Sequence, residues 1–109
     1  MSPIEKPNRS RSASGRPIMA LLDLLGRRWA LRVVWELREG PLLFRELQQR
    51  CEGMSSSVLN QRLRELRTAE IVEVTRGGYR LTQEGRRLLD AFPPLNAWAE
   101  RWAERAGGA

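Results

Sequence analysis

Apolar residues near the start of the chain recur at helical intervals. Ile18, Leu21 and Leu25 are spaced three and four residues apart, directly after a proline. Proline is favoured in the first turn of a helix, and glycine is favoured at its end. We therefore expect a first helix over 17–26.

A second helix is expected from about 29 to 38, and it is apolar on two sides. These sides consist of Val33, Val34 and Leu37, and of Leu31 and Trp35. A helix of this kind must be covered on both sides, so the core takes one face and another surface takes the second. Gly40-Pro41 then breaks the chain.

The third expected helix, 44–50, is short and has a single apolar stripe. Phe44, Leu47 and Cys51 recur at i, i+3 and i+7. Cys51 is therefore interpreted as a small buried apolar residue rather than a redox sensor, because buried thiols are usually inert.

The stretch MSSSVLNQRLRELRT predicts a capped amphipathic helix over 56–68. The hydroxyl of Ser55 suits an N-cap, and the apolar residues of the helix are Leu59, Leu63 and Leu66. Its opposite, polar side consists of Ser57, Asn60, Gln61, Arg64 and Thr68. Asn, Gln, Ser and Arg can read base edges in DNA, and Ser55 and Ser56 can hold a phosphate at a helix N-terminus. On this helix alone, a solvated surface is an equally good interpretation. The order helix, tight turn, helix favours DNA.

The next stretch, IVEVTRGGYRLT, predicts a β-hairpin over 71–81. Two β-branched runs flank Gly77-Gly78, which we place in the turn. Val74 would then oppose Leu81 and face inward. Arg76 would lie at the tip and Arg80 on the outer face, where both can reach phosphate. A hairpin tip that serves solubility alone is the rival interpretation.

Thr82 is expected to cap a further helix, whose apolar side is formed by Leu88, Leu89 and Phe92. Pro93-Pro94 interrupts it, and a last helix follows over about 94–105. There Leu95, Trp98 and Trp102 form an apolar stripe that we expect to pack on the domain or on a partner rather than face water. We expect a dimer interface built from two terminal helices and the second face of the 29–38 helix. Its predicted residues are Leu21, Leu31, Trp35, Leu95, Trp98 and Trp102.

Composition narrows the functional classes. The 109 residues carry a formal net charge of +6, and almost all basic side chains are arginine, which favours a polyanionic partner. There is no histidine and a single cysteine, so the usual general base, the usual metal ligand and a Cys-His or Ser-His pair are all missing. An enzyme, a metal site and a cofactor are not expected.

The chain organisation is simple. We expect a disordered basic tail over 1–15, interpreted as inert in preference to a DNA-touching arm, and one domain over 16–106. No segment is long and apolar enough for a membrane helix, and the single cysteine fits a cytoplasmic protein.

Several motifs together resemble the HxlR-type winged helix-turn-helix regulators, which are similar to MarR-type proteins. In chain order these are Gly26-Arg27-Arg28-Trp29, Gly40-Pro41, Phe44-x-x-Leu47, Met54-Ser55, the Leu59 to Leu66 body, Leu81-Thr82 and Gly85-Arg86. The resemblance covers about 17–102. It implies a mainly α fold with a small β-hairpin wing, and a homodimeric regulator of transcription. The 56–68 helix would enter the major groove of double-stranded DNA, with the wing on the backbone. The terminal helices would form the dimer. The DNA-facing role then falls to Ser55, Ser56, Ser57, Asn60, Gln61 and Arg64.

Three departures from that family pattern matter. Many members carry a cysteine before the proline of the first helix, where this chain has Arg16, so redox sensing by that route is not expected. The wing is short, which reduces minor-groove reach. Pro93-Pro94 falls in a region that is usually a more continuous helix, so the dimer angle and half-site spacing can differ.

Two alternatives stay open beside the DNA-binding dimer. In one, the winged helix is a protein-interaction module that meets an acidic partner and binds no specific DNA. In the other, a small-molecule effector occupies an apolar pocket near the dimer interface. That idea is motivated by the large apolar residues Trp29, Trp35, Trp98 and Trp102. The preferred interpretation is that these residues simply fill the dimer interface. Repression is taken as the working expectation, and activation is equally compatible with the sequence.

Overall fold

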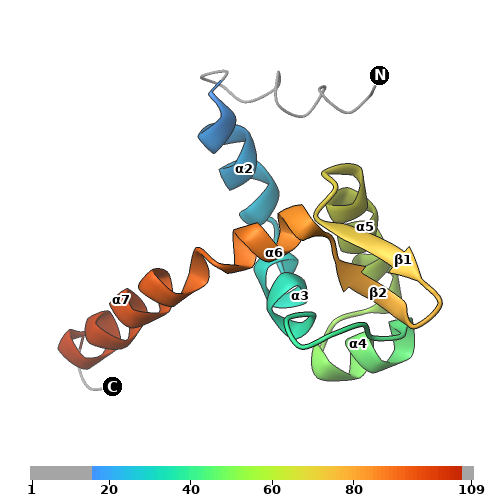
Figure 1. The fold of residues 1–109 in the computed structure, drawn as a ribbon. Coiled ribbons are helices and arrows are strands. Elements are labelled where there is room, and N and C mark those ends of the chain that lie inside the picture. Colours follow the sequence, from blue (N-terminus) through green and yellow to red (C-terminus); the bar gives the residue numbers. More distant parts are fainter. Residues whose placement is uncertain (1–15, 107–109) are drawn as a thin grey trace.

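The computed structural model describes residues 16–106, and Figure 1 shows their arrangement. The elements are α2 (Pro17–Leu25), α3 (Ala30–Glu36), α4 (Phe44–Arg50), α5 (Ser56–Thr68), β1 (Val72–Thr75), β2 (Gly78–Leu81), α6 (Gln83–Leu89) and α7 (Phe92–Arg105). The two strands pair antiparallel. A mainly helical chain with one hairpin is therefore confirmed. The predicted N-terminal tail, 1–15, lies outside the described residues.

One apolar core joins α3, α4, α5 and the hairpin. Val33, Val34 and Leu37 have no exposed surface, as the first of the two predicted α3 faces requires. Their buried partners include Leu47 from α4 and the three leucines of α5, Leu59, Leu63 and Leu66. The core stripes of both helices are thus confirmed, because apolar periodicity alone determines which side of a helix is buried.

Cys51 lies in this core with no exposed surface, which confirms its interpretation as a small buried residue. Burial raises the pKa of its thiol, because removal from water disfavours the thiolate. The thiolate is the reactive form, so burial disfavours reactions of this side chain.

Both predicted N-caps are present. The Ser55 hydroxyl accepts a hydrogen bond from the Val58 N–H at 3.2 Å and starts α5. The Thr82 hydroxyl accepts from the Gly85 N–H at 2.9 Å and starts α6, and it also donates to the Glu70 carbonyl at 2.6 Å. The second bond joins the start of α6 to the chain that enters β1. A cap of this kind is worth about 1 kcal/mol.

The register of the hairpin differs from the sequence prediction. Val72, not Val74, opposes Leu81, and Val74 opposes Tyr79. The turn is formed by Arg76 and Gly77, since Gly78 already belongs to β2. The sequence pattern predicts that Val74 faces inward. In the structure Val74 is 50% exposed and does not belong to the core.

The reason for this register lies outside the hairpin. Leu42 pairs with Tyr79 through two backbone hydrogen bonds. The Leu42 N–H donates to the Tyr79 carbonyl at 2.9 Å, and the Tyr79 N–H donates to the Leu42 carbonyl at 2.8 Å. Gly78 lies directly against the Leu42 carbonyl, where a Cβ would be only 2.3 Å from that oxygen, and its φ is +116°. Only glycine fits this position well, so Gly78 is required in the strand and cannot serve in the turn.

The ends of two helices also differ from prediction. The α3 helix covers Ala30–Glu36 instead of 29–38, because Trp29 adopts a left-handed conformation with φ of 78°. The α7 helix begins at Phe92, so Pro93 and Pro94 lie in its first turn, where no backbone N–H is needed. The prolines therefore start this helix rather than delay it.

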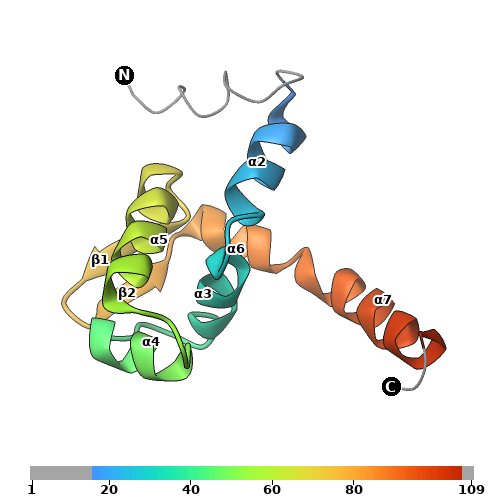
Figure 2. The same ribbon diagram turned by 180° about the vertical axis from the view of Figure 1, so that it is seen from behind.

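The two terminal helices project from the body. Figure 1 shows α7 extending on the side opposite the hairpin, and Figure 2 shows the same from behind, with α2 rising between them. Neither α2 nor α7 contains a buried residue. None of the helices within residues 16–106 has the length and apolar character needed to cross a membrane.

Candidate nucleic-acid interface

The outward face of α5 gathers the predicted DNA-facing residues on one side of one helix. The exposed residues there are Ser55, Ser56, Ser57, Asn60, Gln61 and Arg64. Ser57, Asn60, Gln61 and Arg64 lie on the side away from the three buried leucines, and Ser55 and Ser56 lie at the start of the helix, so the core holds this face toward solvent along nearly four turns. A helix that is anchored on one side and polar on the other is the arrangement that enters a major groove.

The start of α5 combines hydroxyls with a helix N-terminus. The Ser55 oxygen is committed to its cap, and it lies 3.3 Å from the Ser57 hydroxyl. Ser56 is exposed beside them. The N–H groups of the first turn precede the regular intrahelical bonds and carry partial positive charge. This end of α5 is therefore suited to an anionic oxygen such as a phosphate.

The polar side chains in the middle of α5 differ in how free they are. Gln61 donates its amide N–H to the Glu65 carboxylate at 2.9 Å. Asn60 and Arg64 make no hydrogen bond or ion pair with any residue of the described 16–106 segment, so their polar groups face outward unpartnered. Asn60 and Arg64 can therefore engage a ligand with all their polar groups, whereas Gln61 has only its amide oxygen and second N–H free.

The two predicted wing arginines are in different situations. Arg76 lies in the turn itself and is exposed, with no internal partner in the part of the chain that the structure describes. Arg80 lies on the outer face as predicted, but its guanidinium pairs with Glu73 across the hairpin at 2.7 Å. An exposed pair of this kind contributes roughly 0–1 kcal/mol, so Arg80 can exchange Glu73 for a phosphate at small cost.

Arginines without internal partners in the described segment lie on the helix-turn-helix and the wing, and also on α7, where they are Arg101 and Arg105. Several others are neutralised by carboxylates: Arg27, Arg32, Arg38, Arg50, Arg62, Arg80 and Arg87. In the described segment, the exposed arginines of α4, α5 and the hairpin turn that lack such partners are Arg45, Arg64, Arg67 and Arg76. The sequence analysis did not single out Arg45 and Arg67. The signal was present, because both occupy polar positions of predicted helices, but sequence cannot show which carboxylates neutralise which arginines.

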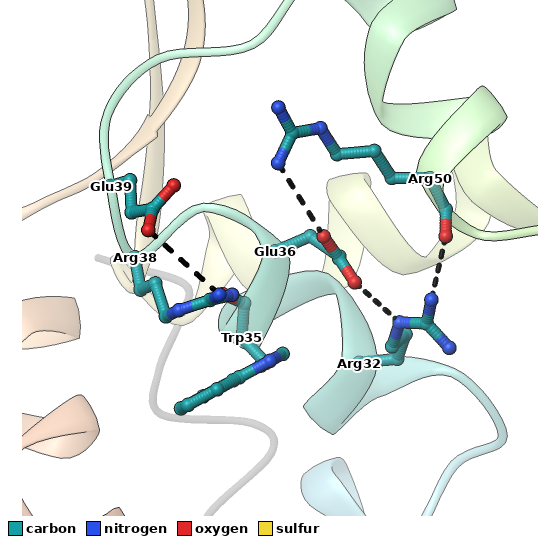
Figure 3. Close-up of polar contacts among 6 residues, drawn as sticks. All are labelled: Arg32, Trp35, Glu36, Arg38, Glu39 and Arg50. Atoms are coloured by element: carbon teal, nitrogen blue, oxygen red, sulfur yellow. Dashed lines mark hydrogen bonds and ion pairs between the residues drawn. The ribbon is translucent and has the colours of Figure 1, made fainter.

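A polar cluster joins the end of α4 to α3 and so orients the helix-turn-helix (Figure 3). The Arg32 Nε donates to the Glu36 carboxylate at 2.7 Å, and its Nη2 donates to the Arg50 carbonyl at 2.6 Å. The Arg50 guanidinium returns to the same carboxylate at 3.8 Å. Figure 3 also shows Arg38, whose guanidinium lies 4.1 Å from the ring centre of Trp35. The two contacts that Arg50 makes with Arg32 and Glu36 are charge-assisted and link α4 to α3, so they limit the rotation of α4 against α3.

The predicted dimer residues lie on the projecting helices and on the second face of α3. Leu95, Trp98 and Trp102 are 57%, 53% and 58% exposed, and the two indoles stack on each other at 5.9 Å. Leu31 is partly exposed, and Leu21 is half-buried on α2. Trp35, also partly exposed, stacks on Phe92 at 6.3 Å and so joins α3 to the start of α7.

A depression of about 360 Å³ lies where α2 ends and α3 begins. Its lining consists of Leu25, Arg27, Arg28, Trp29, Leu31 and Arg32. Of the four tryptophans that motivated an effector pocket, only Trp29 lines it. This depression is bounded by residues of α2, of α3 and of the turn between them, so the effector pocket expected at the dimer interface stays a prediction.

Known proteins share both the sequence pattern and this geometry. The family model described as HxlR-like helix-turn-helix matches residues 24–107. The HTH-type transcriptional regulator YodB of Bacillus subtilis is 34% identical over 89 residues, which are 75% of this chain and 80% of YodB. The quinone-bound structure of YodB aligns with a TM-score of 0.74 over 77% of this chain and 96% of that one.

A further structure, of a protein from Enterococcus faecalis V583 assigned to the MarR family, is 28% identical. It aligns with a TM-score of 0.72 over 89% of this chain and 97% of that one. The winged helix-turn-helix fold class is thereby confirmed. The chain belongs to the HxlR-like helix-turn-helix family and is a transcription regulator with a helix-turn-helix DNA-binding domain.

Proposed function

We propose that this regulator is a homodimer that binds a specific sequence of double-stranded DNA. The outward face of α5 carries this proposal, because it presents Asn60 and Arg64 without internal partners beside a capped helix N-terminus. Asparagine pairs with adenine and arginine with guanine in the major groove, and each good contact contributes roughly 1–3 kcal/mol of discrimination. Such a protein would act in the cytoplasm.

The phosphate contacts in this proposal come from the unpartnered arginines. Arg45 on α4 and Arg67 on α5 flank the recognition helix in the chain, and Arg76 occupies the turn of the wing. Each phosphate that these cations neutralise releases counterions. We therefore expect the logarithm of the affinity to fall linearly with the logarithm of the salt concentration.

The dimer in this proposal is formed by α2 and α7. Both helices project from the body and present large apolar side chains to solvent, and α7 adds a stacked pair of tryptophans. Apolar surface of this extent on a soluble protein marks an interaction site. A two-fold dimer would place two recognition helices about 34 Å apart, one turn of B-DNA. The operator would then be an inverted repeat.

An effector site is a second candidate, favoured by the quinone bound to YodB and by the depression between α2 and α3. We would titrate a panel of aromatic small molecules, a quinone included, into the protein–DNA complex. Release of DNA at a saturable concentration, abolished by Trp29→Ala, would support a site there. Release that persists in Trp29→Ala would place any effector elsewhere.

The proposal is tested by selection from random-sequence duplex DNA, with sequencing of the bound pool and a sedimentation measurement of mass. We expect an enriched inverted repeat and the mass of a dimer. Binding to an acidic protein partner, with no DNA binding at low salt, would establish the interaction-module alternative instead. DNA binding without an enriched motif would show that α5 does not recognise specific bases.

A further inference from the structure

Gln61 and Glu65 form a side-chain pair on α5 whose geometry determines what Gln61 can offer to a ligand. The two lie one turn apart, and the Gln61 Nε2 is 2.9 Å from the Glu65 Oε2. A carboxylate only accepts hydrogen bonds, so the atom that faces it must be the amide nitrogen. The amide oxygen and the second N–H of Gln61 are left for another partner.

Glu65 is itself held from two directions. Its Oε1 is buried and lies 3.5 Å from the Arg62 Nε, and its Oε2 lies 3.7 Å from the Nε of Arg27 in the α2–α3 turn. The Glu65 and Arg62 side chains are only 17% and 14% exposed. The inward oxygen is thus paired with the charge of Arg62 without a hydrogen bond, and the outward oxygen accepts a hydrogen bond from Gln61 and lies near the charge of Arg27.

The orientation of the Gln61 amide matters for base recognition because the two orientations favour different bases. An amide that offers oxygen and one N–H together matches the N6 amino group and N7 of adenine. An amide that is free to rotate by half a turn can instead direct its N–H groups to the acceptors O6 and N7 of guanine. Fixing the amide nitrogen on a carboxylate removes much of that freedom.

We propose that Glu65 is a positioning residue for base recognition: it fixes the Gln61 amide so that Gln61 selects adenine over guanine at one position of each half-site. Glu65 itself does not contact DNA. This inference rests on the proposed function, since it requires α5 to lie in a major groove. It adds which base Gln61 selects and which residue is responsible for the choice.

Two substitutions at Glu65 separate positioning from a merely structural role. Glu65→Asp keeps the charge that pairs with Arg62 but withdraws the acceptor from Gln61 by one methylene. Glu65→Gln loses the charge but keeps an acceptor in place. Because Gln61 donates a hydrogen bond to Oε2 while Oε1 accepts none, the introduced amide places its oxygen at the Oε2 position. A structural role that rests on the negative charge near Arg62 would be preserved by Asp and lost with Gln, whereas a positioning role predicts the reverse.

The experiment is selection from random duplex DNA with the full chain and each variant, followed by affinities for operators that carry adenine or guanine at the selected position. For the unmodified chain we expect adenine to be favoured by roughly 5- to 150-fold at that position. The preference should fall close to unity in Glu65→Asp and persist in Glu65→Gln. Preferences at positions read by other residues should not change.

Gln61→Met provides a test that is independent of how the Glu65 variants fold, because Gln61 is exposed. It should abolish the adenine preference, and combining it with Glu65→Asp should cause no further loss. The inference is overturned if Gln61→Met retains the preference, or if Glu65→Asp retains it while Glu65→Gln loses it. Failure of the unmodified chain to enrich any motif would instead overturn the proposed function itself.

Discussion

The two adjacent glycines of the hairpin should respond very differently to alanine, although their sequence positions look equivalent. A Cβ on Gly78 would lie 2.3 Å from the Leu42 carbonyl oxygen, and the φ of Gly78 is +116°. A Cβ on Gly77 would meet the Pro41 side chain at 3.5 Å and the Thr75 hydroxyl at 3.9 Å, both ordinary contact distances. The comparison therefore isolates backbone strain and crowding at one residue.

The expected magnitude follows from two contributions. A residue with a side chain in a sparsely populated backbone region costs about 1–3 kcal/mol, and forcing a group into a filled space costs about 1–3 kcal/mol more. Gly78→Ala should therefore lower the free energy of unfolding by about 2–6 kcal/mol, a fall in Tm of roughly 8 °C or more for a domain of this size. Gly77→Ala should change it by less than about 1 kcal/mol in either direction.

Urea and thermal unfolding of both variants, followed by far-UV circular dichroism, would measure the difference. The predicted outcome is a large loss for Gly78→Ala and near-identity of Gly77→Ala with the unmodified chain. Equal losses in the free energy of unfolding for the two variants would indicate that both glycines lie in the turn. That result would refute both the observed register and the explanation based on the Leu42 contact.

Three further predictions concern the cap, the buried thiol and the dimer. Ser55→Ala should lower the free energy of unfolding by about 1 kcal/mol, and Ser56→Ala, which removes no cap, should leave urea midpoints nearly unchanged. Because burial raises the native pKa of Cys51, the unfolded chain loses the thiol proton first. The free energy of unfolding should thus be insensitive to this group below about pH 8 and fall above it. A Cys51→Ala variant measured over the same pH range should lack that decline. Replacing both Trp98 and Trp102 by serine should convert the proposed dimer to monomer in sedimentation while the far-UV circular dichroism of the folded protomer is retained, since neither side chain is buried in the protomer. A dimer mass that survives the double replacement would move the interface off α7.

Much of the fold could be predicted because it depends on local periodicity. The leucines of α5 and the apolar face of α3 recur at helical spacing, and the caps at Ser55 and Thr82 follow from a hydroxyl just before each helix. The hairpin register could not be predicted in the same way. It is determined by Leu42, which lies far from the hairpin in sequence but pairs with Tyr79.

The candidate site shows the same division. Which α5 residues face outward follows from the positions of its leucines. The state of each outward side chain depends on its partners, as with Gln61, which is held by Glu65, and Arg80, which is held by Glu73. The contact from Arg27 to Glu65 joins segments that sequence does not place together, so the sequence could not show that Glu65 is held from two sides.

The central claim is that α5 reads bases while the wing contacts only the backbone. The most direct test compares Arg64→Ala and Arg76→Ala by fluorescence anisotropy, on the selected operator and on a scrambled duplex of equal length, at several salt concentrations. Arg64→Ala should weaken operator binding by roughly 5- to 150-fold and affect scrambled DNA much less. Arg76→Ala should weaken binding to both duplexes alike and reduce the salt slope by about 1. Equal losses on both duplexes for both variants would contradict base reading by α5.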